Sequence, residues 1–182
     1  MVCQSVMEKL NQYALSLINQ IPKYEYEALL SIFCLSVVVI LVIYGFKKGY
    51  RKIFQVLLLE YIVLLYSSTL LLRDRVEKCG PNFKPFWSYT SIQGGNEHIL
   101  VESIMNVVVF IPLGMLLKMA FFSIKWWQIL CVGCAISVSI EILQFTFKCG
   151  YAETDDVIHN TLGCFIGYAI TMITMKIISY IK

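Results

Sequence analysis

Residues 139–167 read SIEILQFTFKCGYAETDDVIHNTLGCFIG and join two apolar segments through a short polar link. Polar side chains recur in both segments as well as in the link: Glu141, Gln144, Glu153, Asp155, Asp156, His159 and Asn160. Each segment is long enough to span a bilayer, where an ionisable side chain costs at least about 2.5 kcal/mol. Such side chains normally face the interior of a helix bundle and mark a functional site. These residues therefore predict where in the protein its function resides.

The composition predicts a single membrane-embedded domain. The chain has 182 residues, a usual size for one domain. Apolar residues make up 58% and charged residues 15% of it, against about 45–50% and about 25% in soluble domains. The mean hydropathy of +0.71 places this apolar excess in lipid. A net charge of +3 without an arginine-rich run predicts no nucleic-acid partner.

Hydropathy predicts an all-α fold, a polytopic transmembrane helix bundle of about five spans. Each span is close to the roughly 20 residues that a helix needs to cross about 30 Å of hydrocarbon. The predicted spans are Ala28–Tyr44, Ile53–Leu72, Leu100–Phe122, Trp126–Phe147 and Val157–Ile181. Ahead of them, apolar residues at helical spacing predict an amphipathic helix that lies in the membrane interface and ends at Pro22. A partly ordered tail is the alternative for this segment.

Basic residues predict the orientation of the chain in the membrane. Lys47, Lys48, Arg51 and Lys52 cluster in the short link between the first two spans, and such clusters stay in the cytoplasm. The N-terminus and the loop 73–99 are then outside, and the C-terminus is cytoplasmic. The loop contains turn signals and aromatic residues of the kind that lie at headgroup level. We expect it to form a folded aromatic cap on the outer side.

Polar residues from three predicted spans reach a similar depth in the outer leaflet. At about 1.5 Å per residue, Asn106 and Glu141 lie about 9 Å in from the outer ends of their spans, and Asn160 lies somewhat shallower. Ser137, Glu141 and Gln144 share one side of a helix because of their spacing. Glycines that permit close packing of these helices are Gly114, Gly163 and Gly167. The sequence therefore predicts a tightly packed bundle with a polar pocket that opens outward.

Several of these residues have a structural alternative. Acidic residues at the start of a helix interact favourably with its dipole, so Asp155 is interpreted as a helix cap. Asp156 shares a face with Asn160, and both capping and ligand binding stay open for it. Glu141 is interpreted as functional, with a neutral carboxyl that is merely hydrogen-bonded inside the bundle as the alternative. His159 is interpreted as a structural or interfacial histidine.

Two charged residues lie on the second predicted span. Arg73 ends the span on the outer side, where it either snorkels to the headgroups or pairs with the acidic residues. Glu60, about 10 Å from the cytoplasmic end of the helix, is expected to reach back toward Lys52 or Lys48.

The sequence predicts no cofactor and no metal site. Asp156, Asn160 and Glu141 offer the oxygen ligands that suit Mg²⁺ or Ca²⁺, but the pattern is weak. Cys131 and Cys134 form a C-x-x-C inside a predicted span without a second pair of ligands, so we interpret them as small apolar residues.

Three strings of residues resemble a known family. MNVVVFIPLGMLL at 105–117, SVSIEILQF at 137–145 and TDDVIHNTLGCFIGY at 154–168 are similar to the VanZ-like family of bacterial membrane proteins. The segment NFKPFWSY at 82–89 resembles the first outer loop of that family. The resemblance runs roughly from Tyr61 to Tyr168. It divides the chain into residues 1–52, an amphipathic helix with an extra span, and residues 53–182, a four-span core.

The resemblance implies a multi-pass protein of the bacterial plasma membrane that is associated with reduced susceptibility to glycopeptide antibiotics, teicoplanin in particular. By position it implies these polar site residues: Arg73, Asn106, Glu141, Gln144, Asp156 and Asn160. Glu153 stands where many relatives have an aspartate. The packing glycines that it implies are Gly114, Gly163 and Gly167.

The residues and the resemblance together leave three classes of function. The first is an envelope factor whose outward pocket binds a membrane lipid, a lipid-linked cell-wall precursor or a glycopeptide. The second is an intramembrane enzyme in which Glu141 or Asp156 acts as general base toward a lipid head group. The third is a transporter of a small molecule or lipid that uses the acids for ion coupling, although no internal repeat supports it. The sequence decides neither catalysis nor a homo-oligomer.

Overall fold

The computed structural model describes residues 50–71 and 80–181, and this part of the chain is a helix bundle. Its helices are α3 (Tyr50–Tyr66), α4 (Trp87–Gln93), α5 (Glu97–Ala120), α6 (Trp126–Phe147) and α7 (Thr154–Ile181), with a π-helical turn, η1 (Ser67–Leu71), after α3. Four helices are long and apolar enough to cross a membrane: α3 with η1, α5, α6 and α7. The predicted all-α membrane bundle is confirmed, and the protein is a membrane protein. The first predicted span, the N-terminal amphipathic helix and Arg73 lie outside the described residues.

The helix bounds follow the predicted spans with shifts where polar residues begin a helix. α6 occupies its predicted range. α5 begins three residues before the predicted start, because the Asn96 side chain caps it by accepting a hydrogen bond from the Ile99 N–H at 3.4 Å. α7 also begins three residues early. Asp155 and Asp156 lie in its first turn, where acidic groups meet the positive end of the helix dipole. Hydropathy misses these turns because their residues are polar.

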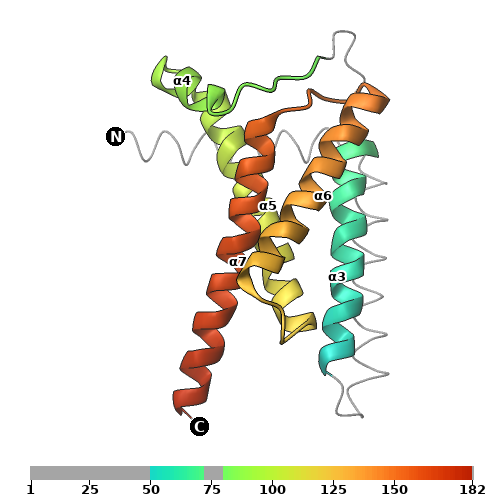
Figure 1. The fold of residues 1–182 in the computed structure, drawn as a ribbon, viewed down its shortest axis with the longest axis vertical. Helices are drawn as coiled ribbons and strands as arrows, with labels where there is room; N and C mark the ends of the chain where they lie inside the picture. The colour runs from blue at the N-terminus through green and yellow to red at the C-terminus, as the bar shows by residue number, and fades with distance from the viewer. Residues whose placement is uncertain (1–49, 72–79, 182) are drawn as a thin grey trace, which may run out of the picture.

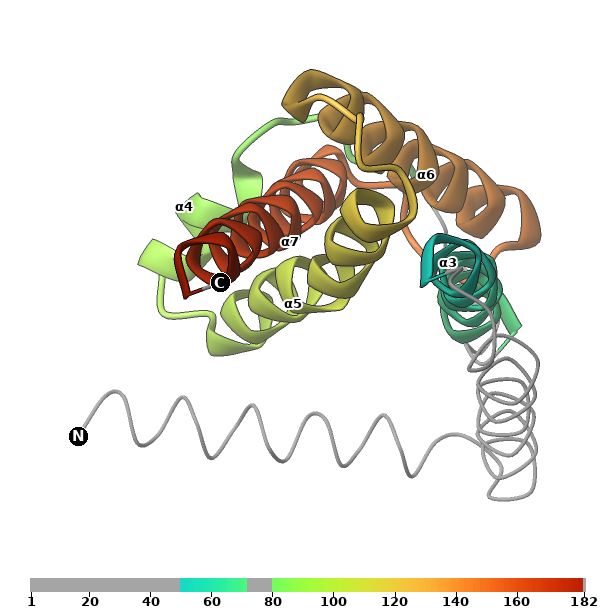
Figure 2. The ribbon, with the colours of Figure 1, turned by 90° about the horizontal axis from the view of Figure 1, so that it is seen from below.

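α5 and α7 form the centre of the bundle and run in the same direction (Figure 1). Along this pair Val107 faces Gly163 and Ile111 faces Gly167, so the register advances equally on both helices. α6 runs the opposite way and packs mainly against α7, whereas α3 packs mainly against α5. Seen along the bundle, α3 lies beside α5 and α6 and away from α7 (Figure 2).

The connections between helices gather at two ends of the bundle. One end, which we call the loop end, carries α4 and the link 148–153 (Figure 1). The other, the turn end, carries the turn 121–125, the start of α3 and the end of α7. α5, α6 and α7 carry the predicted site residues, and each of them has one terminus at the loop end.

Glycines bring α5 and α7 into backbone contact. A Cβ added to Gly114 would lie 1.8 Å from the carbonyl oxygen of Cys164. A Cβ at Gly163 or at Gly167 would lie 2.1 Å or 2.0 Å from a carbonyl oxygen of α5. No side chain fits between backbones this close. Helix association in membranes depends on van der Waals packing, for which small residues at the interface are suited.

The interior of the bundle changes character along its length. Toward the turn end the buried side chains are apolar apart from Lys118 and Thr171, with Leu113, Ile129 and Cys164 among the most buried. Toward the loop end the buried side chains include polar groups: Ser137, Glu141, Gln144, Asp155, His159 and Asn160. The polar half of the interior is where the candidate site lies.

Candidate functional site

One face of α6 carries three buried polar side chains at the loop end. Ser137, Glu141 and Gln144 are all buried, and Glu141 is only 7% exposed. Residues at i, i+4 and i+7 fall on one side of a helix, and α7 packs against this side. The neighbouring residue Ile142 points the other way and is 58% exposed.

Hydrogen bonds join this face of α6 to α7 and to the link before it. The Asn160 amide nitrogen donates to the Ser137 hydroxyl at 2.8 Å. The backbone N–H of Glu153 donates to Oε2 of Glu141 at 3.0 Å. We call Ser137, Glu141, Glu153 and Asn160 the polar cluster. Its members come from two antiparallel helices and the turn between them, so the α6–α7 hairpin itself assembles them.

Asn106 lies on α5 close to the depth of the polar cluster. Val107 faces Gly163, one turn below Asn160, so Asn106 and Asn160 differ in depth by about one turn or less. The amide nitrogen of Asn106 is buried and has no hydrogen-bond partner among the described residues. A buried donor without a partner costs about 1–3 kcal/mol. Among the described residues, this nitrogen therefore remains available to a further acceptor.

Gln144 reaches a different partner from the rest of the predicted site. Its amide nitrogen donates to the Thr69 carbonyl oxygen in η1 at 3.3 Å. Thr69 lies near the loop end of the helix that α3 begins. Gln144 thus fastens that helix to α6, which the sequence did not predict.

Asp156 begins the stripe of α7 that leads to Asn160, one helical turn further along. It is half-buried at the loop end. Arg73, the predicted basic member of the site, lies outside the described residues.

The segment 80–86, which precedes α4 at the loop end, pairs with the link between α6 and α7. The Asn82 N–H donates to the Ala152 carbonyl at 2.8 Å, and the Thr154 N–H donates to the Asn82 carbonyl at 3.2 Å. The two segments thereby form an isolated parallel bridge between Asn82 and Glu153. Because the Glu153 N–H also donates to Glu141, one residue connects the segment 80–86 to the polar cluster.

Asp155 caps a helix, but not its own. Its carboxylate accepts hydrogen bonds from the Phe86 N–H at 2.5 Å and from the N–H and hydroxyl of Ser88 at 2.8 Å and 2.5 Å. These groups form the N-terminus of α4, where free amides need acceptors. We call these three hydrogen bonds the Asp155 clamp. Asp155 is 1% exposed, so the clamp is closed to water. The sequence predicted that Asp155 caps α7, but its carboxylate caps α4. The reason is that the start of α4 lies against the start of α7.

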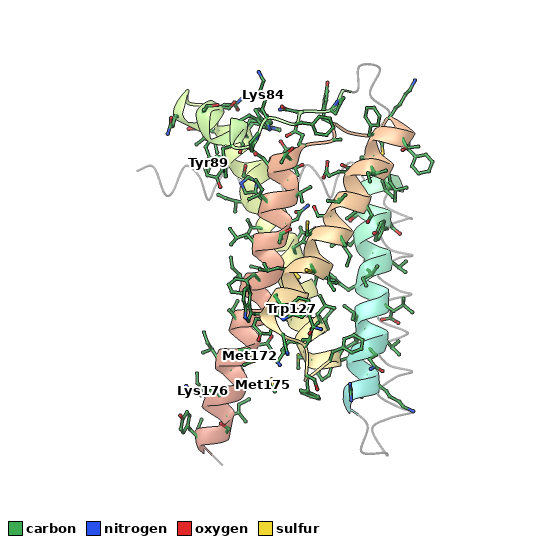
Figure 3. All side chains as sticks on the ribbon, viewed as in Figure 1. Lys84, Tyr89, Trp127, Met172, Met175 and Lys176 are labelled. Carbon is green, nitrogen blue, oxygen red and sulfur yellow. The ribbon has the colours of Figure 1, made fainter. Side chains whose placement is uncertain are left out.

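The same clamp holds Phe86 in an unusual conformation. Its φ is 64°, which bulky side chains rarely adopt. Its ring packs against Tyr89, with centroids 5.9 Å apart. The Tyr89 hydroxyl lies 3.3 Å from Nε2 of His159, and Figure 3 shows Tyr89 at the loop end. His159 thus contacts an aromatic residue of α4, while its buried Nδ1 has no hydrogen-bond partner among the described residues, and its structural role stays a prediction.

The structure does not show the predicted contact of Glu60 with Lys52, and Lys48, the other predicted partner, lies outside the described residues. Oε2 of Glu60 is buried without a hydrogen-bond partner among the described residues. Lys52 lies about two turns away on the same helix and is exposed, so the two side chains do not meet.

The described residues contain no group of three His, Cys, Asp or Glu side chains that could hold a metal ion. In the same part of the chain Cys131, Cys134, Cys149 and Cys164 are free thiols. Cys131 is exposed on the outside of the bundle, whereas Cys164 packs in its centre.

Comparison with known proteins identifies the family. The family model described as VanZ/LLP1 matches residues 31–176. Protein VanZ of Enterococcus faecium is 41% identical over 66 residues, which cover 36% of this chain and 41% of that protein. The alignment thus spans less than half of the relative. No solved structure matches the chain. The family match begins within the first predicted span, and the division of the chain after residue 52 stays a prediction. Because the match covers most of the sequence, the chain belongs to the VanZ/LLP1 family.

Proposed function

We propose that this protein acts in the bacterial plasma membrane and lowers susceptibility to glycopeptides such as teicoplanin. In this proposal an outward-facing polar pocket, formed by the polar cluster with Asn106, Gln144 and Asp156, binds a membrane lipid or a lipid-linked cell-wall component. Membership of the VanZ/LLP1 family supports the link to glycopeptides. The observation that carries the proposal is the buried Asn106 amide nitrogen, which has no hydrogen-bond partner among the described residues and lies at a depth similar to that of buried Asn160.

The energetic argument distinguishes this pocket from ordinary interior packing. Satisfied buried polar groups are compatible with a purely structural role, because their hydrogen bonds compensate for the loss of water. The Asn106 amide nitrogen gains no such compensation from the described residues, and an apolar residue of similar size would cost less at this position. A ligand with an acceptor group would supply the missing hydrogen bond.

The distribution of charge supports the proposed orientation. Six of the seven acidic residues of the described part lie toward the loop end, and Glu60 lies within α3. The six are Glu97, Glu102, Glu141, Glu153, Asp155 and Asp156. At the turn end the charged residues are all basic: Arg51, Lys52, Lys118, Lys125 and Lys176. Basic residues concentrate on the cytoplasmic side of membrane proteins. We therefore place the loop end outside, with the N-terminus outside and the C-terminus in the cytoplasm.

The test is the Asn106→Leu variant, expressed in a strain that lacks the gene. Leucine has nearly the same size and no polar group, so a purely structural Asn106 predicts normal or raised stability and unchanged protection. Ligand binding predicts instead that teicoplanin susceptibility returns to the level of the deletion strain while the protein remains in the membrane. The minimal inhibitory concentration and the immunoblot signal are measured together.

Glu141→Ala gives a second measurement at the same site, with Ile142→Ala as the matched control on the lipid-facing side of α6. Glu141→Ala is expected to lose protection, because the polar cluster loses its carboxylate, and Ile142→Ala is expected to keep it. Full protection by both Asn106→Leu and Glu141→Ala at normal abundance would exclude the pocket as the active feature.

A further inference from the structure

Lys118 is a buried cation at the turn end, far from the polar cluster. It lies in the last turn of α5 and is 6% exposed. Its ammonium donates to the Phe122 carbonyl oxygen at 2.6 Å and lies 5.6 Å from the centre of the Tyr168 ring. An ammonium has three N–H donors, and the described residues give it this one hydrogen bond. Most of its hydrogen-bonding capacity is therefore unused.

No anionic side chain of the described part compensates this charge. The segments that meet at the turn end, residues 50–57, 113–133 and 168–181, contain no Asp or Glu. The charged side chains there are Arg51, Lys52, Lys125 and Lys176, which add positive charge. The carboxyl end of α5 is equivalent to only about half a negative charge. A buried charge is costly unless it is paired, so the surroundings of Lys118 favour an anion from outside the chain.

Arg51 strengthens this preference. Its Nε donates to the Ala120 carbonyl oxygen at 3.1 Å, two residues before the carbonyl that Lys118 binds. Two cations from different helices thus converge on the end of α5. A guanidinium has five N–H donors, and Arg51 is exposed, so its remaining donors face outward.

The turn end also carries exposed apolar side chains. Tyr168, Met172 and Met175 share one face of α7 by their spacing, and the two methionines are exposed. Trp127 of α6 is exposed as well. Figure 3 shows Trp127, Met172, Met175 and Lys176 in the lower part of the molecule, toward the turn end. A ligand at this place therefore meets a cation together with apolar surface.

We infer that the turn end binds the phosphate of an anionic phospholipid, with Lys118 as the central contact. The phosphate accepts hydrogen bonds from the free donors of Lys118. The acyl chains of the lipid lie along the apolar face of α7. Basic groups between transmembrane helices bind anionic headgroups in this way. The inference concerns the opposite end of the bundle from the polar cluster and does not depend on the function proposed there.

The experiment uses the full chain in neutral detergent. Phosphatidylglycerol, phosphatidylcholine or inorganic phosphate is added at equal concentration, and bound lipid is measured by native mass spectrometry together with the melting temperature. We expect phosphatidylglycerol to bind and to raise the melting temperature, and the other two additives to do neither. Lys118→Gln keeps a donor for the Phe122 carbonyl but removes the charge, and we expect it to weaken phosphatidylglycerol binding about fivefold. Lys118→Arg keeps the charge and is expected to bind like the wild type.

Lys52→Gln is the matched control, because it removes an exposed lysine of the turn end for which the structure shows no side-chain contact. It is expected to weaken phosphatidylglycerol binding less than Lys118→Gln does, because Lys52 adds only to the general positive charge of the turn end. Equal affinity of Lys118→Gln and the wild type would overturn the inference, as would equal binding of phosphatidylcholine. A full effect of inorganic phosphate would show an ion site and overturn the lipid assignment. If Lys118→Gln does not fold, the wild type and Lys118→Arg are compared instead. The inference is overturned if neither of them prefers phosphatidylglycerol to phosphatidylcholine.

Discussion

The Gly114→Ala variant is expected to be strongly destabilised. Its new Cβ would lie 1.8 Å from the carbonyl oxygen of Cys164 and 2.7 Å from the carbonyl carbon, whereas real Cβ contacts stay above 3.0 Å. Both obstructing atoms belong to the backbone of α7, so no side chain can rotate away. α5 and α7 must separate instead, which also opens the contacts at Gly163 and Gly167. Overpacking usually costs about 1–3 kcal/mol, and we expect about 3 kcal/mol or more here.

Stability of this variant can be measured by heating detergent-solubilised protein and quantifying the fraction that remains monodisperse by size-exclusion chromatography. Gly80→Ala is the control, because no heavy atom lies within 4 Å of the position of its Cβ. It is expected to melt like the wild type. A melting curve of Gly114→Ala that coincides with both would contradict the close contact between α5 and α7.

The second large effect is expected for Asp155→Ala, which removes the clamp on α4. The carboxylate accepts three hydrogen bonds from Phe86 and Ser88, and its loss leaves buried donors without an acceptor. Hydrogen bonds to charged groups contribute about 1.5–3 kcal/mol each. The segment can escape this cost by opening into water, so the effect is local. We expect the Phe86 and Ser88 amides to exchange their hydrogens about 100-fold faster, as a loss of about 3 kcal/mol implies.

Hydrogen exchange measured by mass spectrometry on peptides that cover residues 80–96 checks this expectation. Ser88→Ala removes one of the three hydrogen bonds and is expected to have a smaller effect of the same sign. Gln93→Ala, an exposed change in the same helix, is expected to leave exchange unchanged. Unchanged protection in Asp155→Ala would show that the clamp does not hold α4.

The clamp also bears on the polar cluster. Asp155 holds α4, and Glu153, two residues earlier, pairs with Asn82 while its N–H donates to Glu141. Three consecutive residues, Glu153 to Asp155, thus connect the segment 80–86, the start of α7 and the buried carboxylate. Release of the segment 80–86 is therefore expected to disturb the position of the Glu141 carboxylate as well.

The spans that the structure describes were predictable because hydropathy and helical spacing are local properties of the chain. α6 has its predicted bounds, and the face formed by Ser137, Glu141 and Gln144 follows from spacing alone. Spacing also identified Gly163 and Gly167 as sites of close approach, although it did not name their partners on α5.

Partners distant in sequence were not predictable. Asp155 binds residues 67 and 69 positions away, and Gln144 binds a carbonyl 75 positions away. A carboxylate in the first turn of a helix can cap that helix or a neighbouring one, and the local pattern of residues is the same in both cases. The burial of Lys118 also depends on a distant residue. Its place near the end of a span does not reveal that its ammonium lies over the ring of Tyr168, 50 positions away.

The amino-acid sequence alone determined that this protein is an all-α membrane protein with polar residues inside its spans. Only helices and closed barrels satisfy every backbone hydrogen bond in lipid, and the cost of each polar side chain there depends on its residue type. Only the tertiary structure decided which polar groups find a partner and which, like the amide of Asn106 and the ammonium of Lys118, keep unused donors. That distinction depends on a few ångströms between helices. The contact of α5 with α7 at Gly114 and Gly163 sets this spacing.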